Sequence, residues 1–372
     1  MSSPATREPS AEETVQHPAY AGAVWALEPD RSGVLSVGAG RRGGPVRIAW
    51  EIHGAGPVKV MLLMGVGFTM AGWQRQTLRL GHDRRARFSV LLLDGRGIGG
   101  SDKVTWRPWA TSDLARDAAE LLDHVGWTGG RAVHVVGISL GGMVAQELAC
   151  LAPERLASLS LVATCACYRD SGALSPSVFA ARLRRAFHGG GDAVPDIVRA
   201  MCPPDFLAGP DEVVLPDPAA TPRCRPPPGG ASSDDGAGGG YRRFRSNFQR
   251  LQAEVLTMRR DGVSFSSAGY LGQIVAVLRH RKSRDQLRVM ADAVGRRRIL
   301  VVHGTRDSLI PVHNGEALID VLEPAVGVIV EGLGHAPLIE RTQWFNELLE
   351  EHFEASAKLD DDSSTPSAAP RL

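Results

Sequence analysis

The sequence has few of the features that stabilise small secreted or metal-bound proteins. Its 372 residues include five cysteines, an odd number, and no two of them form a Cys-x-x-Cys pair. This pattern argues against a disulfide framework and against a zinc site. Reduced thiols in a reducing compartment are the simpler interpretation, so we expect a cytoplasmic protein without a metal site.

An excess of charge of either sign is also absent. The chain carries 42 Lys and Arg against 41 Asp and Glu, which gives a formal net charge of +1. Such a balance provides no electrostatic case for a nucleic-acid partner or an anionic membrane surface. No apolar stretch approaches the ~20 residues that span a bilayer. The N-terminus also lacks the apolar run of a signal peptide. We therefore expect no nucleic-acid partner and no transmembrane segment.

Apolar runs alternate with helical patterns along most of the chain. Helical patterns such as 112–125 and 142–151 separate many of the apolar runs, and several of these runs are apolar almost throughout, as strands buried on both faces are. This alternation predicts an α/β fold with a mostly parallel central sheet flanked by helices. The predicted strands are 46–53, 58–64, 88–94, 132–138, 159–164, 298–303 and 326–330.

Three stretches interrupt this alternation. Residues 1–20 and 355–372 are polar and are expected to be disordered. Between 169 and 296 no convincing core strand is present, and we expect a helical lid over one end of the sheet. The core would then comprise residues 21–168 and 297–354. Within the lid, residues 202–240 are so rich in Pro and Gly that they predict a long mobile loop. The helices predicted in the lid are 177–187, 241–258, 269–280 and 283–294.

The segment Gly137-Ile138-Ser139-Leu140-Gly141 matches the pattern G-x-S-x-G between an apolar strand and an amphipathic helix. A sharp strand-to-helix turn would hold Ser139 in a strained conformation, and the two glycines would leave room for neighbouring backbone. Ser139 would also stand at a helix N-terminus, where backbone N–H groups favour negative charge. The alternative is a Gly-rich turn of a nucleotide-binding fold. The flanking strand and helix favour a nucleophilic serine.

A serine hydroxyl needs a base, and the base needs a carboxylate to orient it. In folds with such a turn, the acid and then the histidine follow the serine along the chain. Asp307 follows the strand predicted at 298–303, and His335 follows the one at 326–330. Both come after the carboxyl end of a strand, where parallel sheets place their ligands. We predict Ser139 as nucleophile, His335 as base and Asp307 as acid, with Asp170 as the rival acid.

A Gly-rich loop, Met64-Gly65-Val66-Gly67, follows the strand predicted at 58–64. The backbone N–H groups of Val66 and Leu140 are the predicted oxyanion hole, and an ordinary Gly-rich turn is the alternative. We interpret His303 and the other remaining histidines as packing or surface residues. Six aromatic residues of the lid could line an acyl pocket, but packing of the lid on the core is the favoured interpretation. They are Phe179, Phe187, Phe206, Tyr241, Phe244 and Tyr270.

Taken together, these motifs resemble the α/β-hydrolase superfamily over roughly residues 45–168 and 296–354. The segment 94–101, DGRGIGGS, looks like its D-x-R-G-x-G-x-S turn, and 304–307 and 334–337 look like its acid and histidine loops. The resemblance implies an α/β-hydrolase fold with a helical lid after the sixth strand, the triad already predicted, and structural roles for Asp94 and Arg96. Met64 departs from the histidine that many relatives have there. More narrowly, the chain resembles a fungal-type group of these hydrolases.

The predicted function is cleavage of a carboxylic ester, or a related acyl compound, through an acyl-enzyme. The partner would be a small-molecule ester or acyl substrate, and no metal or organic cofactor is needed. Acyl transfer, lipase-type cleavage, C–C bond hydrolysis and peracid formation use the same triad. A serine at 139 argues against epoxide hydrolases and haloalkane dehalogenases, which use aspartate. A slow-turnover or non-catalytic small-molecule binding protein on the same fold is the alternative from another class.

Overall fold

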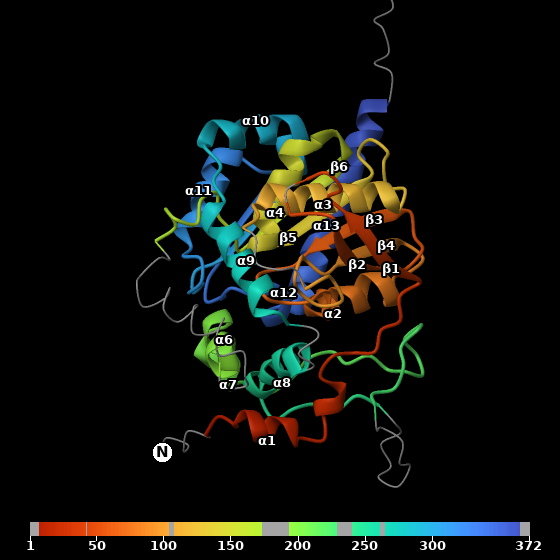
Figure 1. Ribbon diagram of the computed structural model, residues 1–372, viewed down its shortest axis with the longest axis vertical. Helices are drawn as coiled ribbons and strands as arrows, with labels where there is room; N and C mark the ends of the chain where they lie inside the picture. The colour runs from red at the N-terminus through yellow and green to blue at the C-terminus, as the bar shows by residue number, and fades with distance from the viewer. Residues whose placement is uncertain are drawn as a thin grey trace, which may run out of the picture.

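The computed structural model describes residues 7–41, 43–103, 108–172, 193–228, 240–260 and 265–364. Its centre is an eight-stranded sheet in the order β1-β2-β4-β3-β5-β6-β7-β8 (Figure 1). β2 pairs antiparallel with β1 and β4, and all other neighbouring strands are parallel. This sheet confirms the predicted α/β architecture. The strands are β1 Arg31–Val37, β2 Val46–His53, β3 Val58–Leu63, β4 Phe88–Leu93, β5 Val133–Ile138, β6 Leu156–Val162, β7 Ile299–Gly304 and β8 Val326–Val330.

All seven predicted strands are present, and β1 is an additional one. β1 is an edge strand that pairs only with β2, and most of its residues are exposed or half-buried. A strand of this kind lacks the apolar run that marks the buried strands. With β1 counted, the strand that precedes the helical insertion is the sixth, β6, as the resemblance implied.

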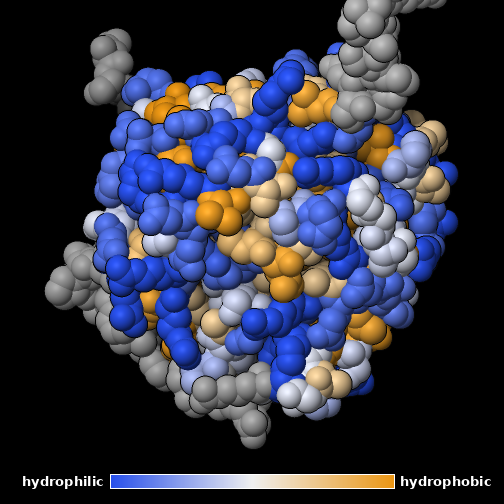
Figure 2. Space-filling model, turned by 90° about the horizontal axis from the view of Figure 1, so that it is seen from above, coloured by the Kyte–Doolittle hydropathy of each residue, from blue (hydrophilic) through white to orange (hydrophobic). Residues whose placement is uncertain are grey.

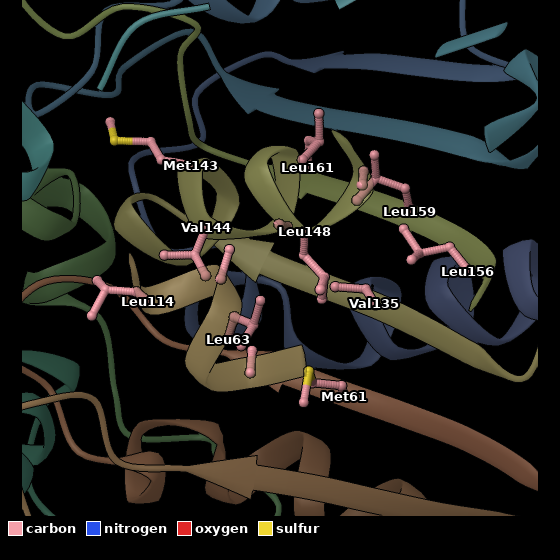
Figure 3. Close-up of a cluster of buried hydrophobic side chains, with 14 of the residues drawn as sticks. Met61, Leu63, Leu114, Val135, Met143, Val144, Leu148, Leu156, Leu159 and Leu161 are labelled. Carbon is pink, nitrogen blue, oxygen red and sulfur yellow. The ribbon is translucent and has the colours of Figure 1, made fainter. Parts of the chain in front are cut away.

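Helices cover both faces of the sheet. On one face lie α3 (Thr111–His124), α4 (Leu140–Leu151), α10 (Arg284–Val294) and α11 (His313–Leu322). The other face is covered by α13 (Thr342–Ser364), with α2 (Gln74–Gln76) near it. Figure 3 shows the first of these interfaces, where Val144 and Leu148 of α4 lie close to Leu63 of β3 and Val135 of β5. Alternate strand residues thus pack on opposite helix layers and hold the strand ends in place. Short helical turns complete the core: η1 Tyr20–Gly22, η2 Met70–Trp73, η3 Thr77–Asp83, η4 Pro153–Arg155 and η7 Arg296–Arg298.

The insertion between β6 and β7 is helical. It contains α6 (Val194–Met201), α7 (Pro204–Ala208), α8 (Asn247–Arg260), α9 (Ser267–Arg279) and α10. The helices predicted at 241–258, 269–280 and 283–294 correspond to α8, α9 and α10. The helix predicted at 177–187 lies outside the described residues. In Figure 1, α6, α7 and α8 form a group below the sheet, next to α1 (Ala11–Val15).

Residues 202–228 differ from the long mobile loop predicted at 202–240. They include α7, and the carboxylate of Asp211 is fully buried. One oxygen of Asp211 accepts hydrogen bonds from the Arg250 guanidinium, with Nε at 2.9 Å, and from the backbone N–H of Phe244 at 2.8 Å. A β-bridge joins Cys224 to Leu27. Polar anchors of this kind replace the apolar periodicity that sequence patterns detect. Residues 229–239 of the predicted loop lie outside the described residues.

Both predicted disordered ends are wrong where the structure describes them. At the N-terminus, Ser10 and Glu13 form a capping box for α1, and Thr14 is buried where its hydroxyl hydrogen-bonds the amide of Gln252 in α8. At the other end, α13 continues to Ser364. The Arg298 guanidinium fixes it by donating to the Asp360 carboxylate at 2.6 Å. These tertiary contacts order segments that are polar in composition.

Among the residues that the structure describes, no helix combines the length and the apolar character needed to cross a membrane. Figure 2 views the molecule from above, the side of α10 in Figure 1. Hydrophilic side chains dominate this face, and the hydrophobic ones form small groups between them.

Candidate active site

Ser139 stands at the turn between β5 and α4, with φ +56° and ψ −119°. A positive φ is strained for a residue with a side chain, and such strain persists only when the surroundings impose it. Here β6 and the residues after it impose the turn. The Ser139 N–H donates to the carbonyl of Val162 at 3.0 Å, and the Thr164 hydroxyl donates to the carbonyl of Ser139 at 2.8 Å. Ser139 therefore has the conformation that the G-x-S-x-G pattern predicts.

The two glycines of the pattern are required by close backbone approach. A Cβ at Gly137 would lie 2.2 Å from the carbonyl oxygen of Gly141. A Cβ at Gly141 would lie 2.0 Å from the carbonyl oxygen of Leu63 at the end of β3. Since real Cβ atoms do not approach backbone this closely, neither position accepts a side chain without distorting the turn.

His335 and Asp307 are brought together by the loops after β8 and β7. The Nδ1 atom of His335 lies 2.7 Å from Oδ2 of Asp307, and both side chains are buried. Burial opposes ionisation of Asp307, but its interactions with His335 and His303 outweigh burial and lower its pKa below the ordinary value. Because an ionised carboxylate only accepts, Nδ1 of His335 carries the proton and Nε2 remains available as a base. The rival acid, Asp170, is exposed.

The other oxygen of Asp307 is held by backbone. Oδ1 accepts hydrogen bonds from the N–H groups of Leu309 at 2.8 Å and Ile310 at 2.9 Å. Oδ2 also lies 3.2 Å from Nε2 of His303. We had interpreted His303 as a packing or surface residue, and the structure places it in contact with the predicted acid. The signal was available, because His303 is the one polar side chain in β7, whose six residues are all buried.

Glu340 is a second residue that the sequence analysis missed. It ends α12 (Pro337–Glu340), and its carboxylate accepts from the N–H groups of Gly334 at 2.9 Å and Ala336 at 3.1 Å. Burial raises the pKa of Glu340. The N–H of His335 itself donates to the carbonyl of Met201, at the end of α6, at 2.9 Å. The loop that carries His335 is thus fixed by α12 on one side and by the insertion on the other.

Ser139 and His335 line one cavity of about 1120 Å³, counted with its open mouth. Helices α6, α8 and α9 of the insertion contribute to its wall, together with loops at the end of the sheet. The wall is mostly apolar and contains four methionines, which adapt to ligand shape. Among the apolar lining residues are Met64, Met143, Met201, Met258, Ile197, Leu251, Val255 and Ile274. A small number of polar groups in an apolar cavity is typical of small-molecule sites.

Two charged residues of α8, Glu254 and Arg259, also line the cavity. The Glu254 carboxylate accepts from both terminal nitrogens of Arg75 in α2, at 2.8 and 3.1 Å. Both side chains are buried, with 3% and 4% of their surface exposed. This ion pair neutralises Glu254 and attaches the insertion to the core. Among the described residues, no group of three or more His, Cys, Asp or Glu is arranged to hold a metal ion.

The predicted oxyanion residues belong to the two segments that meet at Ser139. Leu140 is the first residue of α4, and Val66 lines the cavity next to Gly65, where a Cβ would be 3.4 Å from that of Ser139. The neighbouring N–H of Gly67 donates to the side chain of Gln273 in α9 at 2.8 Å. The loop is therefore held in place from the insertion.

Asp94 and Arg96 have the contacts of structural residues. The Asp94 carboxylate accepts from the N–H groups of Met70 at 2.7 Å and Gly100 at 2.8 Å, and burial raises its pKa to about 6. Arg96 is fully buried and donates to both oxygens of Asp117. These contacts fix the turn after β4.

The lid aromatics divide between the cavity and packing. Tyr270 lines the cavity. Phe244 and Tyr241 are buried in hydrophobic clusters and are not among the cavity's lining residues. Phe206 is partly buried against the same cluster as Phe244. Phe179 and Phe187 lie outside the described residues, so packing accounts for three of the four aromatics that the structure describes.

Comparison with known proteins gives matches over most of the chain. The model of the "Alpha/beta hydrolase family" matches residues 52–348. The chain is 38% identical over 120 residues to a protein named as a carbamate hydrolase, RutD, from Azorhizobium caulinodans, a match that covers 32% of this chain and 42% of that protein. The chain thus spans about two-fifths of the length of the first curated relatives it matches.

A longer match joins the chain to a pimeloyl-acyl-carrier-protein methyl ester esterase from Aeromonas hydrophila. It has 28% identity over 306 residues and covers 82% of this chain and 98% of that protein. Among solved structures, a thermophilic esterase from Thermogutta terrifontis superposes with a TM-score of 0.61 at 22% identity, over 88% of this chain and 99% of the other. At this identity the likeness shows the fold alone. These relatives are bacterial, and the resemblance to a fungal-type group stays a prediction.

Proposed function

The chain belongs to the alpha/beta hydrolase family, and we propose that it hydrolyses a carboxylic ester through an acyl-enzyme formed on Ser139. One observation carries the proposal: the His335 imidazole, oriented by Asp307 at 2.7 Å, lines the same apolar cavity as Ser139 in its strained turn. A nucleophile, a base and a group that orients the base are the parts that acyl transfer requires.

In the proposed reaction, Nε2 of His335 takes the proton of the Ser139 hydroxyl as Oγ attacks the ester carbonyl. The backbone N–H groups of Val66 and Leu140 stabilise the negative charge that develops on the carbonyl oxygen. His335 then returns the proton to the leaving alcohol, which leaves the acyl group on Ser139. A water molecule, deprotonated by His335, then attacks the acyl carbonyl. As the bond between the acyl group and Oγ breaks, the His335 imidazolium returns its proton to Oγ of Ser139, which releases the acid and restores the free serine. Asp307 stabilises the imidazolium in both halves of the reaction.

The substrate in this proposal is a small ester or related acyl compound with an apolar part. The methionine-rich wall supports an apolar acyl or alcohol group, because apolar surface gains free energy on leaving water. Helices α6, α8 and α9 act as a lid that shapes this pocket. The names of two relatives, a methyl ester esterase and a carbamate hydrolase, denote hydrolysis of carbonyl compounds and support the same reaction class.

Turnover of p-nitrophenyl esters from acetyl to palmitoyl tests the proposal. We expect hydrolysis by the wild type, with the preferred chain length measuring the pocket, and a loss of about 10³-fold or more in Ser139→Ala. Ser32→Ala, on the exposed edge strand β1, is the matched control and is expected to keep full activity. Normal turnover by folded Ser139→Ala would refute the nucleophile.

Reaction of Ser139 with a fluorophosphonate separates this function from its rivals. Labelling with no turnover of any ester would favour acyl transfer or a slow-turnover binding protein. Absence of both labelling and turnover would favour a non-catalytic binding protein on the same fold.

A further inference from the structure

His303 makes a side-chain contact with the predicted acid that the proposed mechanism does not use. Its Nε2 atom lies 2.7 Å from the carbonyl oxygen of Ile310 and 3.2 Å from Oδ2 of Asp307. Both neighbours are acceptors, so Nε2 must carry a proton. The N–H group points mainly at the carbonyl oxygen of Ile310, and it also faces the carboxylate of Asp307. On the other side of the ring, Nδ1 is buried without a hydrogen-bond partner among the described residues, which favours the neutral ring with its proton on Nε2.

The position of the His303 ring is fixed by tight packing. A Cβ added to Gly315, in α11, would lie 2.4 Å from Cβ of His303 and 2.6 Å from its Nδ1. Only a glycine lets α11 approach the ring so closely. Ile310 also links His303 to Asp307. Its carbonyl accepts a hydrogen bond from His303, and its N–H donates to Oδ1 of Asp307. Asp307 therefore cannot rotate without disturbing β7 and the loop that follows.

We propose that His303 is a positioning residue, which orients Asp307 and weakens the attraction of Asp307 for the proton on His335. Oδ2 faces two histidine N–H groups, one from His335 at 2.7 Å and one from His303 at 3.2 Å. A second donor on this oxygen withdraws charge from the first hydrogen bond. The imidazolium form of His335 is then stabilised less than it would be by Asp307 alone. This role rests on the proposed function of Ser139, His335 and Asp307.

Other charged groups near the base come from separate elements. Glu340 of α12 accepts hydrogen bonds from backbone N–H groups of the His335 loop and interacts electrostatically with His335 and Asp307, and Glu254 and Arg259 of α8 line the cavity. None of these three is the partner of His303 in its hydrogen bond. A change at His303 therefore acts on His335 through Asp307.

The test compares His303→Leu, which removes the donor, with His303→Gln, whose terminal NH₂ group reaches the place of Nε2. The measurement is the rate of fluorophosphonate labelling of Ser139 against pH. We expect the acid limb to move to higher pH by about half a unit in His303→Leu, since a weak hydrogen bond to a charge is lost. His303→Gln is expected to keep the wild-type profile. His134→Leu is the matched control, because His134 is a buried histidine of β5 that hydrogen-bonds Ser158 of β6. This variant is expected to leave the pH profile unchanged.

An unshifted acid limb in folded His303→Leu would overturn the proposal. A labelling rate that falls by the same factor at every pH in His303→Leu and His134→Leu would also overturn it, because a general structural effect would then explain both variants. A second measurement needs no variant. Two-dimensional ¹H–¹⁵N correlation spectra of the wild type give the tautomer of each histidine ring, and we expect His303 to carry its proton on Nε2 at pH 7. A proton on Nδ1 would overturn the proposal even if the variants do not fold. If wild-type Ser139 does not react at all, the proposed function fails, and the tautomer still decides the role of His303.

Discussion

Replacing Asp307 with asparagine exchanges one carboxylate oxygen for an NH₂ group, and the structure determines which one. Oδ1 accepts from the N–H groups of Leu309 and Ile310, at 2.8 and 2.9 Å. An NH₂ group there would face two buried donors, at a cost of about 1–3 kcal/mol for each lost hydrogen bond. At the place of Oδ2, the His335 ring can change its tautomer, and the His303 N–H already donates to the carbonyl of Ile310 at 2.7 Å. The amide oxygen therefore takes the place of Oδ1, and the NH₂ group points at His335.

This orientation reverses the tautomer of the base. An NH₂ group donates to Nδ1 of His335, so the ring proton must move to Nε2. Nε2 then faces the cavity as a donor and cannot take the proton of Ser139. The same change in a serine protease triad lowers kcat about 10⁴-fold, equivalent to about 5.4 kcal/mol at the transition state. We expect a loss of similar size here.

The assay is hydrolysis of the best p-nitrophenyl ester by wild type, Asp307→Asn and Asp170→Asn, with circular dichroism to show that each variant is folded. Asp170→Asn is the matched control, because the same change is made at the exposed rival acid. It is expected to keep full activity. If folded Asp307→Asn stays within about tenfold of wild type while Asp170→Asn loses activity, the tautomer argument and the assignment of the acid are both wrong.

Two further predictions concern stability. Acid is expected to lower the free energy of unfolding below pH 6.5, because burial lowers the pKa of three histidines. The pKa is lowered to about 3 in His134, to about 3 in His280 and to about 4 in His352. Each of these histidines takes up a proton on unfolding, which lowers the free energy of unfolding by about 1.4 kcal/mol per pH unit as the pH falls. Asp94, whose pKa is raised to about 6, releases a proton on unfolding and so offsets one of the three histidines below pH 6. Urea unfolding at pH 7 and pH 5 measures the difference, and equal stabilities would contradict the argument. The second prediction concerns Arg75→Met, which leaves Glu254 buried without its partner. We expect thermal unfolding to show a free energy of unfolding lower by about 3–5 kcal/mol. The double variant that also carries Glu254→Leu is expected to recover most of this loss. A single variant as stable as wild type would show that water or another cation reaches Glu254.

The sequence predicted those parts of the fold whose physical cause is local. Each buried strand is an apolar run, and the turn at Ser139 needs glycine at 137 and 141 because backbone from β3 and α4 approaches them. Asp307 and His335 follow strands that are adjacent in the sheet, so their order along the chain already places them at one edge. Periodicity and motif order are sufficient for such features.

Contacts between distant segments were not predictable in this way. Thr14 is ordered by Gln252, and α13 continues beyond residue 355 because Arg298 binds Asp360. Residues 202–228 are held by Asp211, whose partners lie more than thirty residues further along the chain. In each case composition, polar or rich in Pro and Gly, indicated disorder, while a hydrogen bond from another element provides the order. Composition measures the cost of ordering a segment and contains no information about a distant partner.

For His303 and Glu340, by contrast, the sequence contains a signal, although both residues were missed. A buried polar side chain must have a partner, because leaving it unpaired costs more than an apolar residue would. His303 is the one polar side chain of β7, and Glu340 follows directly on the apolar stretch Ala336–Ile339. Both break an apolar pattern at the place where the predicted site lies. A polar residue in a run that should be buried on both faces is therefore evidence for a contact, and in this chain both contacts hold the acid or the base of the proposed triad.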